Sequence, residues 1–131
     1  MSWKKKEEQL FDLLKTNHIK DLEWSEVDNS HHDCFSLQYR CDIDLKCRNT
    51  HYDELLIERV KYDALIARAL KFNTHPLYIN QTPQGVYVFV LSKLKQPTWE
   101  VRNMPKTSHF SDRNFTPKEV GYLSINDAFL L

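Results

Sequence analysis

Residues 39–48 alternate between apolar and charged side chains, and this pattern restricts the possible folds more than any other stretch of the chain. The apolar positions are Tyr39, Cys41, Ile43, Leu45 and Cys47, and the charged positions are Arg40, Asp42, Asp44, Lys46 and Arg48. Successive side chains of a β-strand point to opposite faces, so the pattern predicts a strand with one apolar and one charged face. We expect Ile43 and Leu45 to be buried, with Asp44 and Lys46 together on an open face.

The remaining segments predict two helices and several shorter strands. Residues 2–17 carry apolar side chains on one helical face, and residues 51–72 contain neither proline nor glycine, so both segments are expected to be helical. Residues 32–38 either form a hairpin with residues 39–48 or continue into them as one long bent strand. Further strands are expected at residues 21–28, 77–80, 86–91 and 120–125, and an irregular segment at residues 95–114. This order favours an α/β fold with a central mixed β-sheet flanked by α-helices.

Length and composition narrow the class of protein. A chain of 131 residues favours one domain, residues 1–131. Lys plus Arg and Asp plus Glu number 18 each, so the net charge of zero gives no overall attraction to nucleic acid, although a local basic patch is compatible with it. Two glycines exclude a glycine-rich phosphate loop. The longest apolar run, residues 86–91, is too short to span a membrane, and the N-terminal residues do not resemble a signal peptide, which predicts a cytoplasmic protein.

The three cysteines, Cys34, Cys41 and Cys47, form no CxxC pair. Their odd number and spacing argue against a disulfide framework and against a structural zinc site. We therefore expect three free thiols, with Cys41 and Cys47 on the apolar face of the predicted strand. Catalysis by a Cys34 nucleophile is disfavoured, because nothing in the sequence orients a base such as His31 or His32 toward it.

Asp33, followed by Asp44-x-Lys46 and then by a helix that bears Lys61, resembles the PD-(D/E)xK, or restriction-endonuclease-like, nuclease superfamily. The two halves of that motif lie on neighbouring strands, and a helix that packs on the sheet follows them. The order is similar over about residues 3–91, and residues 92–131 form a C-terminal extension; His32 stands where the motif has a proline. The resemblance is to small members such as junction resolvases and short phage-encoded nucleases. It implies a restriction-endonuclease-like fold and a magnesium-dependent (or manganese-dependent) deoxyribonuclease.

The residues themselves are compatible with this chemistry. Hydrolysis of a phosphodiester is assisted by a divalent ion that neutralises the phosphate and activates a water molecule. Magnesium takes oxygen ligands and keeps several waters, so Asp33, Asp44 and the backbone carbonyl of Leu45 would suffice as its protein ligands. Lys46 would hold the attacking water or the phosphate charge. Further candidates are Glu8 and Asp42 as metal ligands, and Lys61 and Arg48 as substrate-binding residues.

Two other classes of function fit the same pattern. The first alternative is a non-catalytic module that binds nucleic acid or protein on a nuclease-like scaffold, and the second is a structural protein whose charged strand face is only solvated. Metal dependence would separate the nuclease from both. If the protein is a nuclease, its small size favours a homodimer that covers a duplex or a junction.

Overall fold

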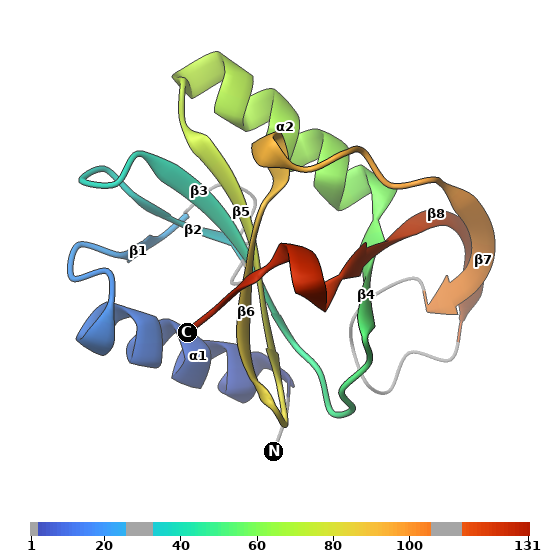
Figure 1. Ribbon diagram of the computed structural model, residues 1–131, viewed down its shortest axis with the longest axis horizontal. Helices are drawn as coiled ribbons and strands as arrows, with labels where there is room; N and C mark the ends of the chain where they lie inside the picture. The colour runs from blue at the N-terminus through green and yellow to red at the C-terminus, as the bar shows by residue number, and fades with distance from the viewer. Residues whose placement is uncertain (1–2, 26–32, 106–113) are drawn as a thin grey trace.

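The computed structural model describes residues 3–25, 33–105 and 114–131 (Figure 1). Its helices are α1 (Trp3–Asn17) and α2 (Arg59–Phe72), with two short 3-10 turns, η2 (Leu91–Lys93) and η3 (Ile125–Asp127). Its strands are β1 (Glu23–Trp24), β2 (Asp33–Ser36), β3 (Cys41–Cys47), β4 (Glu54–Glu58), β5 (His75–Thr82), β6 (Gly85–Val90), β7 (Glu100–Pro105), β8 (Phe115–Ser124) and β9 (Phe129–Leu130).

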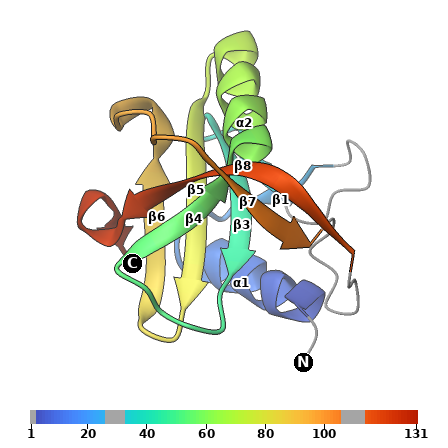
Figure 2. The same ribbon diagram turned by 90° about the vertical axis from the view of Figure 1, so that its right-hand side faces the viewer.

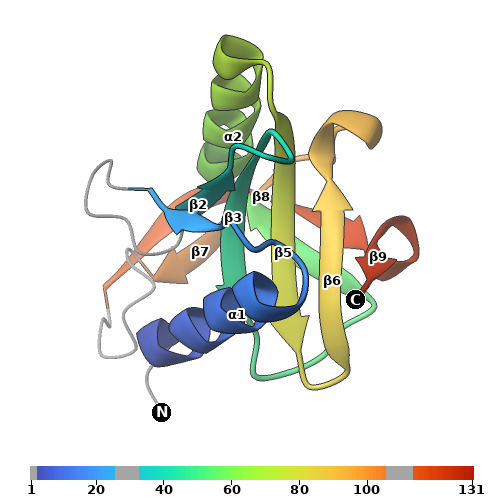
Figure 3. The ribbon, with the colours of Figure 1, turned by 90° about the vertical axis from the view of Figure 1, so that its left-hand side faces the viewer.

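The strands form two sheets. The larger is a six-stranded mixed sheet with the order β1-β2-β3-β5-β6-β9, in which only β3 and β5 run parallel among the paired strands. The smaller is an antiparallel sheet with the order β4-β8-β7. Helix α1 covers one face of the larger sheet (Figure 3), whereas α2 and the smaller sheet lie on the other face (Figure 2). A mixed sheet flanked by helices confirms the predicted fold class.

The apolar face of β3 packs under α1. Ile43 and Leu45 are each 1% exposed, and they meet Leu10 and Leu14 of the helix in one apolar cluster. The cluster also contains Phe11, Leu22, Cys34, Cys41, Ile79 and Val86. This confirms the expected burial of Ile43 and Leu45. Removing this much apolar surface from water provides the main stabilisation of this half of the molecule.

Strands β2 and β3 form a hairpin, which confirms one of the two arrangements that the sequence left open. Its turn places Arg40 in the left-handed region, with φ of 52°. The carboxylate of Asp21 fastens the turn, because it accepts hydrogen bonds from the Ser36 hydroxyl at 2.6 Å and from the Gln38 backbone N–H at 2.8 Å. Parts of the strands expected at residues 21–28 and 32–38, namely residues 26–28 and 32, lie outside the described residues.

The prediction of one helix over residues 51–72 is wrong at its N-terminal end. Helix α2 begins at Arg59, and the preceding segment is strand β4, which pairs with β8. Leu55 and Ile57 of β4 are each 1% exposed and pack in a second apolar cluster, which lies on the α2 side of the larger sheet. Leu56 between them is half-buried on the opposite face of β4. Alternating burial is the signature of a strand, and it fits these residues because their partner strand covers them.

The charged face of β3 is not open as expected. Asp42 and Asp44 are 8% and 4% exposed, because α2 and β4 lie over that side of the larger sheet (Figure 1). The same side carries the second apolar cluster, in which Leu65 of α2 meets Tyr78 and Phe89 of the sheet. The carboxylates of β3 are therefore buried polar groups beside a core, rather than a solvated surface.

The C-terminal residues take part in both sheets, and the irregular segment expected at residues 95–114 includes strand β7. Residues 106–113 of that segment lie outside the described residues. Strand β8 supplies Val120 and Leu123 to the interior. Gly121 of β8 lies so close to Pro97 and Trp99 that a Cβ atom there would stand 2.5 Å from the Pro97 Cβ, so this position requires glycine.

The three cysteines are free thiols, as predicted. Burial raises the pKa of Cys34 and, to about 11, the pKa of Cys41 and of Cys47. A thiol with a raised pKa is a poor nucleophile at neutral pH, which agrees with a packing role. Within residues 3–25, 33–105 and 114–131, no helix has the length and apolar character needed to cross a membrane.

Candidate active site on the charged face of β3

The two predicted acidic residues are brought together by the β2–β3 hairpin. Asp33 and Asp44 are directly opposite each other in the antiparallel register, so their side chains share a face. The two carboxyl groups are hydrogen-bonded to each other. Burial is the main cause that raises the pKa of Asp44, and the charge of Asp33 raises this pKa further. In the absence of a cation, burial and the neighbouring carboxylate therefore favour the protonated form of Asp44.

Two lysines lie beside this acidic pair. Lys46 follows Asp44 by two residues on the same face of β3, and Lys61 projects from the first turn of α2. Their positive charges oppose the upward shift of the Asp44 pKa. Burial lowers the pKa of Lys46, and the nearby charge of Arg48 lowers it further, while Asp44 acts in the opposite direction. Lys46 is therefore less firmly protonated than a surface lysine.

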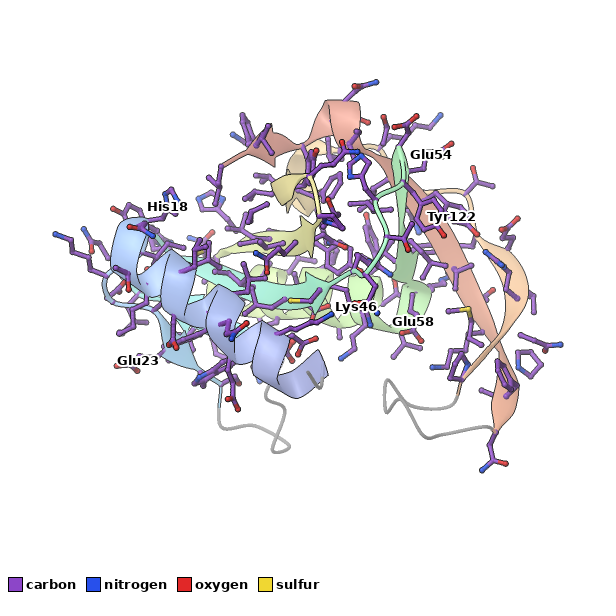
Figure 4. The ribbon with its side chains drawn as sticks, turned by 90° about the horizontal axis from the view of Figure 1, so that it is seen from below. His18, Glu23, Lys46, Glu54, Glu58 and Tyr122 are labelled. Carbon is purple, nitrogen blue, oxygen red and sulfur yellow. The ribbon has the colours of Figure 1, made fainter. Side chains whose placement is uncertain are left out.

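Asp44, Lys46 and Lys61 line a small cavity of about 70 Å³, and Asp33 contacts it through its pairing with Asp44. The cavity is lined by Glu7, Asp44, Leu45, Lys46, Arg48, Leu56, Glu58, Lys61, Tyr78 and Met104. Seen from below, Lys46 lies between α1 and β4, with Glu58 of β4 beside it (Figure 4). The side chain of Leu45 belongs to the cluster under α1, so its backbone is the part that reaches the cavity. The structure thus gathers Asp33, Asp44, Lys46, Lys61 and the Leu45 backbone at one place.

The acidic residue that α1 contributes is Glu7, which the sequence analysis missed, and not Glu8. Glu7 is 3% exposed and lines the cavity, whereas Glu8 is exposed and does not. A signal for this was present in the sequence. Glu7 precedes Leu10, Phe11 and Leu14 by three, four and seven residues, which places it on the buried stripe of the helix.

Glu58 is a second acidic residue of the cavity wall. It ends β4 and stands at the N-cap position of α2. Its carboxylate forms an ion pair with Lys118 of β8, with 2.8 Å between Oε1 and Nζ. This contact ties the smaller sheet to the start of α2, and so fixes the side of the cavity that faces β3.

Arg48, which was predicted to bind substrate, is already engaged with protein groups. Its guanidinium donates to the Asn80 side-chain oxygen and to the Tyr78 hydroxyl, each at 2.9 Å, and to the Leu56 carbonyl. Burial raises the pKa of Tyr78, whose hydroxyl in turn donates to the Leu56 carbonyl at 2.9 Å. Arg48 therefore joins β3, β4 and β5 and braces the cavity.

Asp42, a further predicted metal ligand, lies away from this cavity. It accepts a hydrogen bond from the Thr74 hydroxyl at 2.5 Å, and it lines a groove at the C-terminal end of α2 with Arg68 and Lys71. Residues 42 and 44 share a strand face, but Asp42 is hydrogen-bonded to Thr74, just beyond the C-terminal end of α2, whereas Asp44 lies near Lys61 in the first turn of that helix. Asp42 therefore belongs to a different part of the surface from Asp33 and Asp44.

Among the described residues, no three His, Cys, Asp or Glu side chains converge closely enough to make a metal site by themselves. Sites built only from such side chains are typical of zinc and other transition metals. A pair of carboxylates beside a backbone carbonyl is instead the ligand set that suits magnesium, which keeps several of its waters.

No protein-family model and no curated protein matches this sequence. Among solved structures, the chain is similar to Hjc, a Holliday junction resolvase from the archaeal hyperthermophile Archaeoglobus fulgidus. The two share 13% sequence identity with a TM-score of 0.50, over 92% of this chain and 90% of that chain. Hjc is a member of the restriction-endonuclease-like, or PD-(D/E)xK, superfamily.

This chain has the restriction-endonuclease-like fold. The match spans 92% of this chain, so it extends beyond residues 3–91 and includes most of residues 92–131. At 13% identity the likeness concerns the fold alone. The arrangement of the acidic pair and the two lysines on that restriction-endonuclease-like fold is therefore the basis for any functional argument.

Proposed function

We propose that this chain is a metal-dependent nuclease that hydrolyses phosphodiester bonds of DNA, with magnesium or manganese as its cofactor. The observation that carries the proposal is the hydrogen-bonded pair of Asp33 and Asp44 with Lys46 and Lys61 beside it. The likeness of the fold to that of a Holliday junction resolvase supports DNA as the substrate. DNA is accordingly the proposed partner, and a homodimer remains the assembly that the size of the chain favours.

The residues of the cavity fit a divalent cation. The buried carboxylate of Asp44 and the half-buried carboxylate of Asp33 would repel each other if both were ionised, and a cation between them would remove that repulsion. Asp33, Asp44 and the Leu45 carbonyl would be its ligands, and Glu7, which lines the same cavity, would contact the ion through a bound water. When bound, the ion would supply charge neutralisation at the phosphate and acidify a water molecule.

The remaining groups have roles that follow from their charge and position. Lys46, with its lowered pKa, would orient the attacking water or take part in proton transfer at its Nζ atom. Lys61 would place a positive charge against the phosphate as negative charge develops there. Glu58 and Arg48 would act as positioning residues, because their contacts with Lys118 and with Asn80 hold the walls of the cavity.

A purely structural or binding module is less well supported by these residues. Burying Asp44 against Asp33 costs folding free energy, and a scaffold that needed only its shape would be more stable with apolar residues there. Ionisable groups with strongly shifted pKa values in a cavity are typical of catalytic sites. We therefore rank the non-catalytic alternative below the nuclease.

The test is a cleavage assay with linear, nicked and branched DNA in the presence of magnesium or manganese. Wild type should cut at least one substrate, and Lys46→Ala should slow the reaction by ~10²–10³-fold, which is typical for loss of one transition-state group. Asp44→Asn should also abolish detectable cleavage, because a neutral amide oxygen replaces an anionic ligand. Lys71→Ala, which removes an exposed lysine at the far end of α2, is the matched control and should cut like wild type.

Absence of cleavage by wild type on all three substrates, with either metal, would overturn the nuclease proposal. Equal rates for wild type and Lys46→Ala would instead place the chemistry elsewhere or identify a contaminating nuclease. Circular dichroism of each variant should match wild type, which separates a defect in the active site from a defect in folding.

A further inference from the structure

A second cavity, of about 650 Å³, opens on the face of the smaller sheet that points away from the apolar core. Its walls include the aromatic rings of Tyr52 and Tyr122, the guanidinium of Arg102, and the carboxylates of Asp53 and Glu54. Tyr52 is 63% exposed, so its ring is available to a ligand. The volume lies within the range of roughly 300–1,000 Å³ that is usual for sites that bind small molecules.

This cavity adjoins the candidate active site. Arg48 and Leu56 line both cavities, so one wall separates the larger cavity from the acidic pair. Glu58 and Glu54 stand at the two ends of β4, and Figure 4 shows Tyr122 near Glu54 and Lys46 near Glu58. Because Arg48 and Leu56 line both cavities, a ligand group bound at this shared wall of the larger cavity would lie beside a phosphate held in the smaller one.

The cavity is held in shape by contacts on several sides. The Tyr122 hydroxyl accepts a hydrogen bond from Arg102, which links β7 to β8 across the cavity wall. The backbone carbonyl of Asp53 accepts a hydrogen bond from the Ile125 N–H at 2.9 Å. His51, just before Tyr52, contacts the Thr82 hydroxyl at 2.9 Å. The segment that carries Tyr52 is thus anchored at both ends before any ligand binds.

The chemistry of the walls fits a nucleobase better than a phosphate. Tyrosine rings and a guanidinium plane stack on the flat face of any base. The carboxylates of Asp53 and Glu54 would repel a phosphate, but they can accept hydrogen bonds from the amino groups of a base. Arg48 is held by several protein partners, whereas Arg102 gives one N–H to the Tyr122 hydroxyl, so the plane of the Arg102 guanidinium remains available for stacking.

We propose that this cavity binds the base of an unpaired nucleotide next to the scissile phosphate. The inference rests on the proposed nuclease function, and it specifies the substrate class as DNA with unpaired bases beside the cleavage point. A base inside a regular duplex is stacked and paired, and extruding it costs free energy, whereas an unpaired base enters without that cost. Flaps, gaps and bulges should therefore be bound better than a duplex or a junction in which every base is paired.

The experiment compares two DNA probes, a duplex and the same duplex with a single-stranded flap whose first unpaired base is 2-aminopurine. Binding is measured by anisotropy in EDTA, so that no cleavage occurs, and stacking is measured by quenching of the 2-aminopurine fluorescence. Cleavage of both probes is then measured with magnesium or manganese. The variants are Tyr52→Ala, at an exposed position, and Tyr122→Leu, which keeps an apolar side chain on β8. Phe72→Ala, another exposed aromatic at the far end of α2, is the matched control.

Wild type and Phe72→Ala should prefer the flap and quench its fluorescence. Each tyrosine variant should reduce the preference by about tenfold, the usual effect of losing one base-stacking contact, and should lose the quenching. An equal affinity of wild type for the two probes, or an unchanged preference in both variants, would overturn the base-binding cavity even if wild type cuts DNA. Loss of preference in the variants without any cleavage by wild type would support the cavity and overturn the nuclease.

Discussion

The two faces of β3 are built from adjacent residues and have opposite character. On the α1 side, Ile43 and Leu45 lie in a cluster made almost entirely of apolar side chains. On the α2 side, Asp44 is buried and Lys46 is half-buried among charged and polar groups, and the pKa values of both are shifted. The same strand therefore contributes stability through one face and ionisable chemistry through the other.

This difference shows how a small protein can hold a costly site. Desolvating Asp44 against Asp33 opposes folding, and this cost has to be offset by burial of apolar surface elsewhere. The apolar burial that offsets this cost is on the same strand, because alternation along β3 places an apolar residue next to each charged one, on the opposite face. Substitutions on the apolar face of β3 should therefore mainly lower stability, whereas substitutions on the charged face should mainly lower activity.

The largest expected effect on stability is on the apolar face. Leu45→Ala should lower the free energy of unfolding by about 2–5 kcal/mol, because it leaves a cavity under α1. Leu37→Ala, at a position that is 78% exposed in the hairpin turn, is the matched control and should change it by less than about 0.5 kcal/mol. Urea denaturation measures both. Similar losses of unfolding free energy in the two variants would contradict the claim that the apolar face of β3 provides the stability.

A second expected effect concerns the charged face, where Asp44→Asn should not destabilise the protein at neutral pH without a divalent cation. The folded-state pKa of Asp44 is raised above the ordinary value of 3.8, so its contribution to stability is complete below that value and is lost as the pH rises through the folded pKa. Asparagine does not ionise, so the stability of Asp44→Asn does not fall in this way as the pH rises. In EDTA, the stability of the variant relative to wild type should therefore increase as the pH rises from about 4 to neutral. A relative stability that decreases over this range would contradict the prediction.

The smallest expected effect comes from Asp21, whose pH dependence has the opposite sign. Hydrogen bonds from Ser36 and then from Gln38 lower the pKa of Asp21 below 3.8. Its contribution to stability is therefore present above the unfolded pKa and is lost as the pH falls through the folded pKa. Asp21→Asn should be less stable than wild type at neutral pH, with a difference that shrinks in acid. Asp12→Asn, at an exposed position on α1, should show no such trend in the same denaturation series.

Local alternation allowed the central features to be predicted from the sequence. The strand around Ile43 and the burial of its apolar face depend on residues close together in the chain. The pairing of Asp33 with Asp44 was expected only from the family resemblance, because the sequence itself left the hairpin and one long bent strand open. The resemblance to the restriction-endonuclease-like superfamily rested on the same short stretch, and the fold that it implied is confirmed. The burial of the charged face was missed, because it depends on α2 and β4, which pack there from elsewhere in the sequence.

Strand β4 was missed for a related reason. Leu55, Leu56 and Ile57 are apolar in succession, so they fit a helix as well as a strand. Pairing with β8 determines that these residues form a strand, with Gly121 opposite Ile57 and Leu123 opposite Leu55. Such long-range pairing leaves no trace in local periodicity. Glu7 differs, because its place on the buried stripe of α1 was readable from the spacing of the leucines.

The most direct test of the central claim is thermal denaturation of wild type and Asp44→Asn with increasing manganese. A cation that binds only the folded state raises the melting temperature in proportion to its binding free energy. The melting temperature of wild type and of Leu37→Ala should rise with manganese but not with sodium at equal ionic strength, and that of Asp44→Asn should not rise. No rise for wild type, or an equal rise for Asp44→Asn, would contradict a divalent-cation site on the charged face of β3.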